Sequence, residues 1–158
     1  MLSDSALLGL PAPAKLNLFL HVVGRRPDGK HLLESVFTLI DLHDTIDLFR
    51  LEEPVVERTG DVIGNVEKDL CVRAARLLME TFDVRSGVRI HVEKRIPAGA
   101  GMGGGSSDAA TVLIGLNRLF GLGLSRSALM ELGERLGADV PFFIFGRTGF
   151  VEGIGEII

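Results

Sequence analysis

Apolar and polar residues alternate along two stretches of the chain, and alternation with a period of two is typical of half-buried strands. Over residues 15–23 the even positions are apolar, and over residues 88–93 Val88, Ile90 and Val92 are separated by charged or polar residues. Each of these stretches is therefore predicted to form one strand.

Three further apolar stretches have the composition of strands without a strict alternation. Residues 36–51 are predicted to form two strands, with residues 41–44 between them. Residues 142–145, Phe-Phe-Ile-Phe, are interpreted as a short buried strand because the run is apolar throughout. Residues 149–153 are interpreted as a last strand.

Helical spacing of apolar residues occurs in three other stretches, which cover residues 68–83, 109–120 and 125–136. Ser125 is a candidate N-cap for the last of these helices, and Gly137 stands where a helix commonly ends. For the middle helix, three successive residues before the apolar pattern are N-cap candidates, namely Ser106, Ser107 and Asp108.

The remaining segments complete a chain of 158 residues, which is long enough for one domain with a sizeable core. Residues 1–10 are expected to form a loose N-terminal arm, and residues 11–158 a single domain. The polar residues 52–64 are expected to form a hairpin or loop whose charged side chains, Arg58 among them, face solvent.

Composition narrows the class of protein. Hydrophobic residues make up 46% of the chain and charged residues 24%, so a folded globular protein is expected. The net charge of −4 argues against a general nucleic-acid binder, which would need a basic face. A single cysteine, Cys71, excludes a disulfide framework and indicates a reducing, cytoplasmic location. No apolar run is long enough to span a membrane, and residues 1–10 lack a basic signal-peptide start.

The strongest local signal for function is a glycine-rich loop between the strand over residues 88–93 and the helix over residues 109–120. Glycines let the backbone approach a ligand closely, and the amides and dipole of a helix N-terminus favour an anion, most often a phosphate. The predicted phosphate-binding residues are Pro97, Ala98, Gly99, Ala100, Gly101, Met102, Gly103, Gly104, Gly105, Ser106 and Ser107.

Two other interpretations of this loop remain open at the level of sequence. It can be a surface loop without a ligand, or it can belong to a dinucleotide fingerprint, because Gly99, Gly101 and Gly104 match G-x-G-x-x-G. The fingerprint requires a second parallel strand after the helix, whereas Ser125 begins another helical pattern. A Walker A motif is excluded because Ser106, and no lysine, follows Gly105.

Four polar residues outside the loop are candidates for chemistry. Lys15 and Asn17 share the polar face of the first strand, although a solvated face explains them equally well. His31 follows a Pro-Asp-Gly turn and is either a ligand-binding or a surface residue. Asp139 precedes Val140-Pro141 and is either a cap or a catalytic carboxylate.

Taken together, four segments resemble a known family. They are Pro-Ala-Lys-Leu-Asn-Leu at residues 13–18, Asp-Gly-Lys-His at 28–31, the glycine loop continued to residue 110, and Gly-Ala-Asp-Val-Pro at 137–141. In this order they resemble the GHMP-type small-molecule kinases, over nearly all of residues 11–158. The resemblance implies an α+β fold, the GHMP-kinase N-terminal domain (ribosomal protein S5 domain 2-like), with a mixed sheet and helices packed on one side.

The resemblance also implies a reaction and roles for residues. Within the family, the chain is most similar to kinases that use ATP and Mg²⁺ to phosphorylate the 2-hydroxyl of 4-(cytidine 5′-diphospho)-2-C-methyl-D-erythritol in terpenoid biosynthesis. Lys15 and Asp139 match the catalytic lysine and aspartate of these kinases, and the glycine loop matches their ATP site. Asn17 and His31 match substrate-binding residues, with His31 at the cytidine end, and Ser107 is placed near the metal ion.

Departures from the family pattern modify these expectations. Lys30 stands where the family has a tyrosine that stacks on cytosine, and Asp69 stands where it has an asparagine on the adenine side.

The family has a second domain beyond residues 152–156, and we expect this chain to lack it. Such a chain is expected to expose an apolar cleft face that favours self-association, and to show little activity alone. A non-catalytic nucleotide-binding module is the alternative to an active kinase.

Overall fold

A mixed five-stranded sheet forms one layer of the molecule, and the computed structural model describes residues 5–146 and 149–151. The strand order is β1-β2-β4-β3, and β5 also pairs with β2. All pairs are antiparallel except β3 with β4, which is parallel. The strands are β1 (Ala6–Arg25), β2 (His31–Leu51), β3 (Val56–Gly60), β4 (Gly87–Glu93) and β5 (Gly149–Val151).

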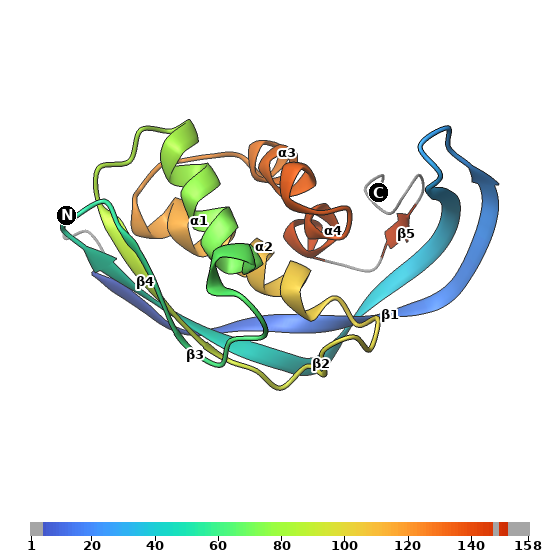
Figure 1. The fold of residues 1–158 in the computed structure, drawn as a ribbon, viewed down its shortest axis with the longest axis horizontal. Coiled ribbons are helices and arrows are strands. Elements are labelled where there is room, and N and C mark those ends of the chain that lie inside the picture. Colours follow the sequence, from blue (N-terminus) through green and yellow to red (C-terminus); the bar gives the residue numbers. More distant parts are fainter. Residues whose placement is uncertain (1–4, 147–148, 152–158) are drawn as a thin grey trace.

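Helices cover one face of the sheet, as Figure 1 shows. A short 3-10 turn, η1 (Val66–Lys68), precedes α1 (Leu70–Thr81), and the glycine-rich loop leads from β4 into α2 (Gly104–Leu119). Two further helices, α3 (Arg126–Leu136) and α4 (Val140–Phe145), complete this layer. None of the helices in the described part of the chain is long and apolar enough to cross a lipid bilayer.

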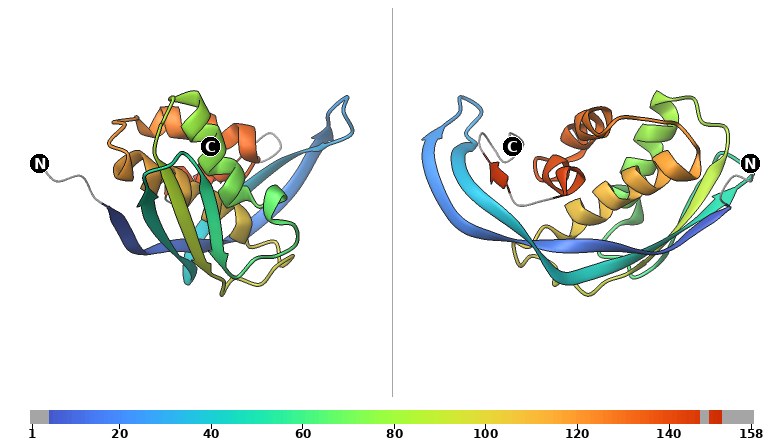
Figure 2. Two further views of the ribbon diagram at one scale, coloured as in Figure 1. Left: turned by 60° about the vertical axis from the view of Figure 1, so that its left-hand side comes forward. Right: turned by 180° about the vertical axis from the view of Figure 1, so that it is seen from behind.

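The β1–β2 hairpin is much longer than the other strands and bends along its length. Register shifts interrupt its pairing at several places, including the steps from Pro13 to Lys15 and from Asn17 to Phe19. Such irregularities bend a strand and increase its twist. As a result the far end of the hairpin curls away from β4 and back toward α3 and α4 (Figure 2). Lys15 comes directly after the first of these two register shifts.

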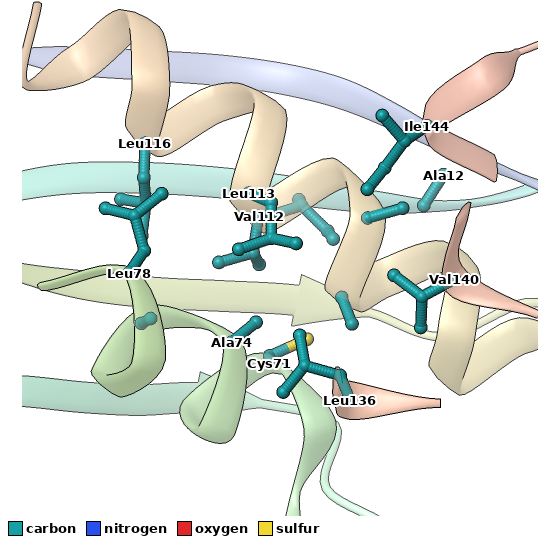
Figure 3. Close-up of a cluster of buried hydrophobic side chains, with 14 of the residues drawn as sticks. Ala12, Cys71, Ala74, Leu78, Val112, Leu113, Leu116, Leu136, Val140 and Ile144 are labelled. Carbon is teal, nitrogen blue, oxygen red and sulfur yellow. The ribbon is translucent and has the colours of Figure 1, made fainter. Parts of the chain in front are cut away.

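The core lies between the helices and the sheet (Figure 3). From the sheet it receives the alternating residues of β2 and β4, and from the helices the inner faces of α1 and α2. Burying each large aliphatic side chain contributes about 1.5–3 kcal/mol of hydrophobic free energy. Members with no solvent exposure include Ile46, Leu48, Leu78, Val88, Ile90, Val92, Val112, Leu113 and Leu116.

Several local predictions are confirmed. The strand over residues 88–93 and the helices over residues 68–83, 109–120 and 125–136 are all present within a few residues of their expected bounds. The Ser125 hydroxyl accepts a hydrogen bond from the Ala128 amide, as an N-cap should. Cys71 is 2% exposed and packs in the core, where burial raises the pKa of its thiol well above the usual value.

Other predictions are wrong. Residues 36–51 form one continuous strand, because β2 pairs with β1 on both sides of residues 40–42, and with β4 from Thr45 onward. The expected arm over residues 1–10 is a strand from Ala6 onward. Residues 52–64 contain β3, which adds to the sheet parallel to β4. Residues 142–145 are helical, since Pro141 stands at the start of α4, where a proline is well tolerated.

The N-cap of α2 is also different from the prediction. Gly103 occupies this position in the left-handed conformation, and no side chain caps the helix. Ser106, Ser107 and Asp108 lie inside the helix instead.

The strand that was expected over residues 149–153 is present as β5, and residues 152 and 153 lie outside the described part of the chain.

Candidate active site

The glycine-rich loop lines a cavity of about 270 Å³ at the N-terminus of α2. Gly99, Gly101 and Gly103 have φ angles of 71°, 72° and 72°, in the left-handed region that favours glycine. The first helical hydrogen bond runs from the Ser107 amide to the Gly103 carbonyl, so the amides of the first turn of α2 are not used within the helix. Free amides and a helix dipole at a cavity are the physical requirements for binding phosphate.

Gly103 is fixed by packing as well as by its backbone conformation. A Cβ atom at this position would lie 2.7 Å from Cζ of Phe143 and 3.3 Å from Cγ of Lys15. Strand β1 also contacts the loop directly, because the Lys15 amide donates a 2.9 Å hydrogen bond to the Met102 carbonyl. The lysine of β1 and the glycine loop are therefore held in a fixed relation.

Lys15 and Asp139, which are far apart in sequence, meet beside this loop. The Lys15 ammonium is 3.7 Å from Oδ2 of Asp139, and the lysine is 5% exposed. It also donates a 2.8 Å hydrogen bond to Oδ1 of Asn17 and lies 3.7 Å above the centre of the Phe37 ring. Burial lowers the pKa of Lys15, and attraction to Asp139 partly offsets this effect.

Asp139 occupies the N-cap position of α4, but its carboxylate makes no capping hydrogen bond. Its oxygens are therefore available to Lys15 and to a ligand. At 3.7 Å, two unit charges attract each other by about 4 kcal/mol at an effective dielectric constant near 20, before the cost of desolvation. An ionised carboxylate is the form that can accept a proton.

A second charged cluster lies behind the glycine loop and was not predicted. The Lys94 ammonium donates hydrogen bonds of 2.7 Å to Asp44 and 2.8 Å to Asp108, which join the segment that follows β4 to β2 and α2. Asp44 also accepts hydrogen bonds from the amides of Arg95 and Ile96, at the start of the loop segment. Both carboxylates are almost fully buried, at 0% and 3% exposure. The cluster anchors both ends of the glycine loop.

The balance of charge among Asp44, Lys94 and Asp108 explains which of the two carboxyl groups keeps its proton. Burial and the neighbouring Asp44 raise the pKa of Asp108 to about 8. Burial would also raise the pKa of Asp44, but hydrogen bonds, chiefly with Asp108 and from the Ile96 amide, lower it. One buried lysine neutralises one carboxylate, so the second retains its proton near neutral pH.

Arg58 contradicts the expectation of a solvated surface in residues 52–64. Its side chain is 2% exposed, lines the loop cavity, and lies 3.5 Å from Oδ2 of Asp69. The other carboxylate oxygen of Asp69 caps α1 by accepting hydrogen bonds from the amides of Cys71 and Val72. The wall of the cavity opposite the glycine loop is thus built around a buried ion pair.

The structure brings most, but not all, of the predicted residues together. Residues 97–105 line the loop cavity, whereas Ser106 and Ser107 are not among its lining residues. Ser107 is fully buried and its Oγ has no hydrogen-bond partner. Lys15, Asn17 and Asp139 form the group described above. His31 is the first residue of β2 and pairs with Arg25; its side chain lies outside the described part of the structure.

These features define a class of protein. A glycine loop with the geometry for binding phosphate, beside a lysine–carboxylate pair, is an arrangement suited to transfer of a phosphoryl group to a hydroxyl. Dinucleotide binding of the kind considered from the sequence is not supported, because α2 continues into α3 and α4 without the required parallel strand. Residues 69–147, half of the chain, match the family model of the GHMP kinases N terminal domain. The chain therefore belongs to the GHMP kinases.

Individual relatives are more specific. The chain is 60% identical over 147 residues to the 4-diphosphocytidyl-2-C-methyl-D-erythritol kinase of Ralstonia pickettii (strain 12J), and 61% identical over 150 residues to that of Polynucleobacter necessarius subsp. necessarius (strain STIR1). These matches cover 92% and 94% of this chain but 51% of each relative. The chain thus spans about half the length of the curated relatives it matches.

A solved structure supports the same conclusion about the fold. The crystal structure of a 4-(cytidine 5′-diphospho)-2C-methyl-D-erythritol kinase superimposes with a TM-score of 0.79 at 42% sequence identity. The match covers 93% of this chain and 52% of that chain. The expected α+β fold of a GHMP-kinase N-terminal domain, with a mixed sheet and helices on one side, is confirmed.

Proposed function

We propose that this chain is the ATP-binding part of a kinase that phosphorylates the 2-hydroxyl of 4-(cytidine 5′-diphospho)-2-C-methyl-D-erythritol in terpenoid biosynthesis. The contact of 3.7 Å between Lys15 and Asp139, beside the glycine loop, carries the proposal. The names of the relatives at about 60% identity support this choice of acceptor. A cytoplasmic location fits this role.

The residues have distinct tasks in this proposal. Amides of the glycine loop and of the first turn of α2 hold the phosphates of ATP in line with the acceptor. Asp139 accepts the proton of the attacking hydroxyl. Lys15 orients Asp139 and balances the negative charge that develops during transfer. Asn17 fixes the Lys15 ammonium through its 2.8 Å hydrogen bond and can contact the acceptor, with His31 toward the cytidine.

A magnesium ion would neutralise charge on the phosphates. The described residues contain no group of three or more histidine, cysteine or acidic side chains that could hold a metal ion. This agrees with an ion that takes its ligands mainly from phosphates and water. The unpaired Oγ of Ser107 is the candidate protein ligand.

The test is an assay of ADP release by this chain with ATP, Mg²⁺ and the cytidylyl acceptor. The proposal expects weak release that depends on the acceptor, and stronger release once the family's second domain is joined to this chain. Nucleotide binding without release would favour the non-catalytic module. Equal release with and without the acceptor would contradict the proposed substrate.

We also propose that copies of this chain associate with each other through the exposed, curved part of β1. Four alternate residues of this strand are between 44% and 62% exposed, namely Leu16, Leu18, Leu20 and Val22. Exposed apolar patches commonly mark contact surfaces.

A further inference from the structure

The Lys15 ammonium lies 3.7 Å above the centre of the Phe37 ring, and the pairing of β1 with β2 explains this contact. Lys15 pairs with Leu39, and Asn17 pairs with Phe37, without a register shift between them. Residues two positions apart on a strand share one face, so Lys15 and Phe37 are diagonal neighbours on the same side of the sheet. The register of the hairpin therefore brings the long lysine side chain over the ring.

The contact between Lys15 and Phe37 is almost closed to solvent. The lysine is 5% exposed and the phenylalanine 3%. Burial removes water from the ammonium group and lowers the pKa of Lys15, because the charged form loses hydration. The negative face of an aromatic ring attracts a cation, and this attraction is stronger when both groups are desolvated. The ring therefore offsets part of the cost of burying the charge.

Asp139, on the other side of the ammonium, is a less constant partner. It is the carboxylate that acts on Lys15 among the described residues, and its side chain is 31% exposed, so water screens part of the attraction. In the proposed function it also takes up the proton of the acceptor hydroxyl, and it is then neutral. From that moment the charge of Lys15 depends on neutral partners, namely Asn17 and the Phe37 ring.

Phe37 is the first of three rings that lead to the glycine loop. Its ring centre lies 5.2 Å from that of Phe142, which lies 5.3 Å from that of Phe143, and both pairs are nearly perpendicular. This edge-to-face arrangement is a favourable one for aromatic pairs. A Cβ at Gly103 would lie 2.7 Å from Cζ of Phe143, so the last ring lies against the loop. The rings therefore link the position of the Lys15 ammonium to that of the glycine loop.

We propose that Phe37 is a positioning residue whose ring holds Lys15 as a cation between Asp139 and the glycine loop. This inference takes the role of Lys15 from the proposed function, but the contact itself can be tested in the chain without substrate. The negative face of the ring stabilises the charged form of the lysine, and its bulk keeps the ammonium in place. A phenylalanine that acted by packing alone would supply the second effect and not the first.

The experiment is an NMR titration of the Lys15 side chain through its ε-carbon signal, which Lys15→Arg assigns. Replacing Phe37 with trifluorophenylalanine withdraws electrons from the ring face and changes the size of the ring little. The pKa of Lys15 should fall, because the proton affinity of its amine should drop about fivefold or more when the cation–π attraction is lost. A singly fluorinated phenylalanine should give an intermediate shift. Phe37→Leu, which removes the ring, should lower the pKa at least as much as trifluorination.

The matched control is trifluorophenylalanine at position 142. Phe142 is also fully buried, but no cation lies over its ring among the described residues, so the titration of Lys15 should not change. A graded shift that occurs only with fluorination at position 37 would support the inference. An unchanged titration at position 37, or equal shifts for the two positions, would overturn it.

This titration is independent of the test of the proposed function, because it requires neither ATP nor acceptor. The titration can shift as expected while the chain joined to the family's second domain releases no ADP with the cytidylyl acceptor. The contact would then stand and the proposed reaction would fail. If instead ADP release depended on the acceptor and fluorination had no effect on Lys15, the proposed function would stand and Phe37 would act by packing alone.

Discussion

At the scale of single residues, the carboxylate of Asp139 has the most specific chemical role. Replacing it with asparagine keeps the size of the side chain but removes the proton acceptor. In a protein that joins this chain to the family's second domain, Asp139→Asn should lower turnover by about 10²–10⁴-fold and leave ATP binding nearly unchanged, because a general base acts in the transition state. Single-turnover kinetics and a nucleotide titration measure the two effects. Glu131→Gln, at an exposed carboxylate of α3, is the control, and equal turnover in Asp139→Asn would exclude the base assignment.

Asp108 makes stability depend on pH, since burial and Asp44 raise its pKa to about 8. Between about pH 4 and about pH 8 the native state holds a proton that the unfolded state has lost, so the free energy of unfolding should fall as pH rises through this window. The pKa of Asp44 is lowered, so its contribution is lost only in more acidic solution.

Asp108→Asn should flatten this dependence, because asparagine mimics the protonated acid and still offers an oxygen to Lys94. Urea unfolding at several pH values measures the slope. Asp83→Asn, at an exposed position, should keep the slope of the wild type. If the free energy of unfolding of Asp108→Asn depended on pH as steeply as that of the wild type, another group would be responsible for this dependence.

At the scale of elements, the glycine loop offers a matched pair of positions. Gly99 and Gly103 have nearly the same left-handed φ, but a Cβ at Gly99 meets nothing within 4 Å, whereas one at Gly103 would meet Phe143 at 2.7 Å. Gly99→Ala should cost about 1 kcal/mol of stability from backbone strain alone. Gly103→Ala should lower the stability by more than Gly99→Ala does, and it should also weaken nucleotide binding, which a titration with AMP-PNP measures. Equal affinities in the two variants would mean that the position of Gly103 does not matter for the phosphates.

The same elements show what the sequence can and cannot predict. The strand, glycine loop and α2 were predictable because their signals are local and contiguous. The cluster of Asp44, Lys94 and Asp108 was not, because Asp44 and Lys94 are 50 residues apart and meet only when β2 and β4 pair. Arg58 looked like a surface residue for the same reason, since Asp69 reaches it only after β3 joins the sheet. Residues 142–145 were mistaken for a strand because a short apolar run has no period of its own.

At the scale of the whole molecule, β1 lies at the edge of the sheet, and its curved part lies beyond the layer of helices (Figures 1 and 2). An edge strand with free backbone groups and an apolar face is a template for pairing with another strand. A second copy of this chain has the same edge strand. An antiparallel contact between two β1 strands would therefore give the backbone groups of both edges hydrogen-bond partners.

We therefore expect the weight-average mass in sedimentation experiments to increase with protein concentration. Leu18→Lys, at a position that is 62% exposed in the curved part of β1, should shift the equilibrium toward monomer by about tenfold or more, because a buried charge at the contact is costly. Leu8→Lys removes an equally exposed leucine, at 66%, from the other end of the same strand and should leave the equilibrium unchanged. If both variants behave alike, the contact lies elsewhere, and a wild type that stays monomeric at all concentrations would rule out the association.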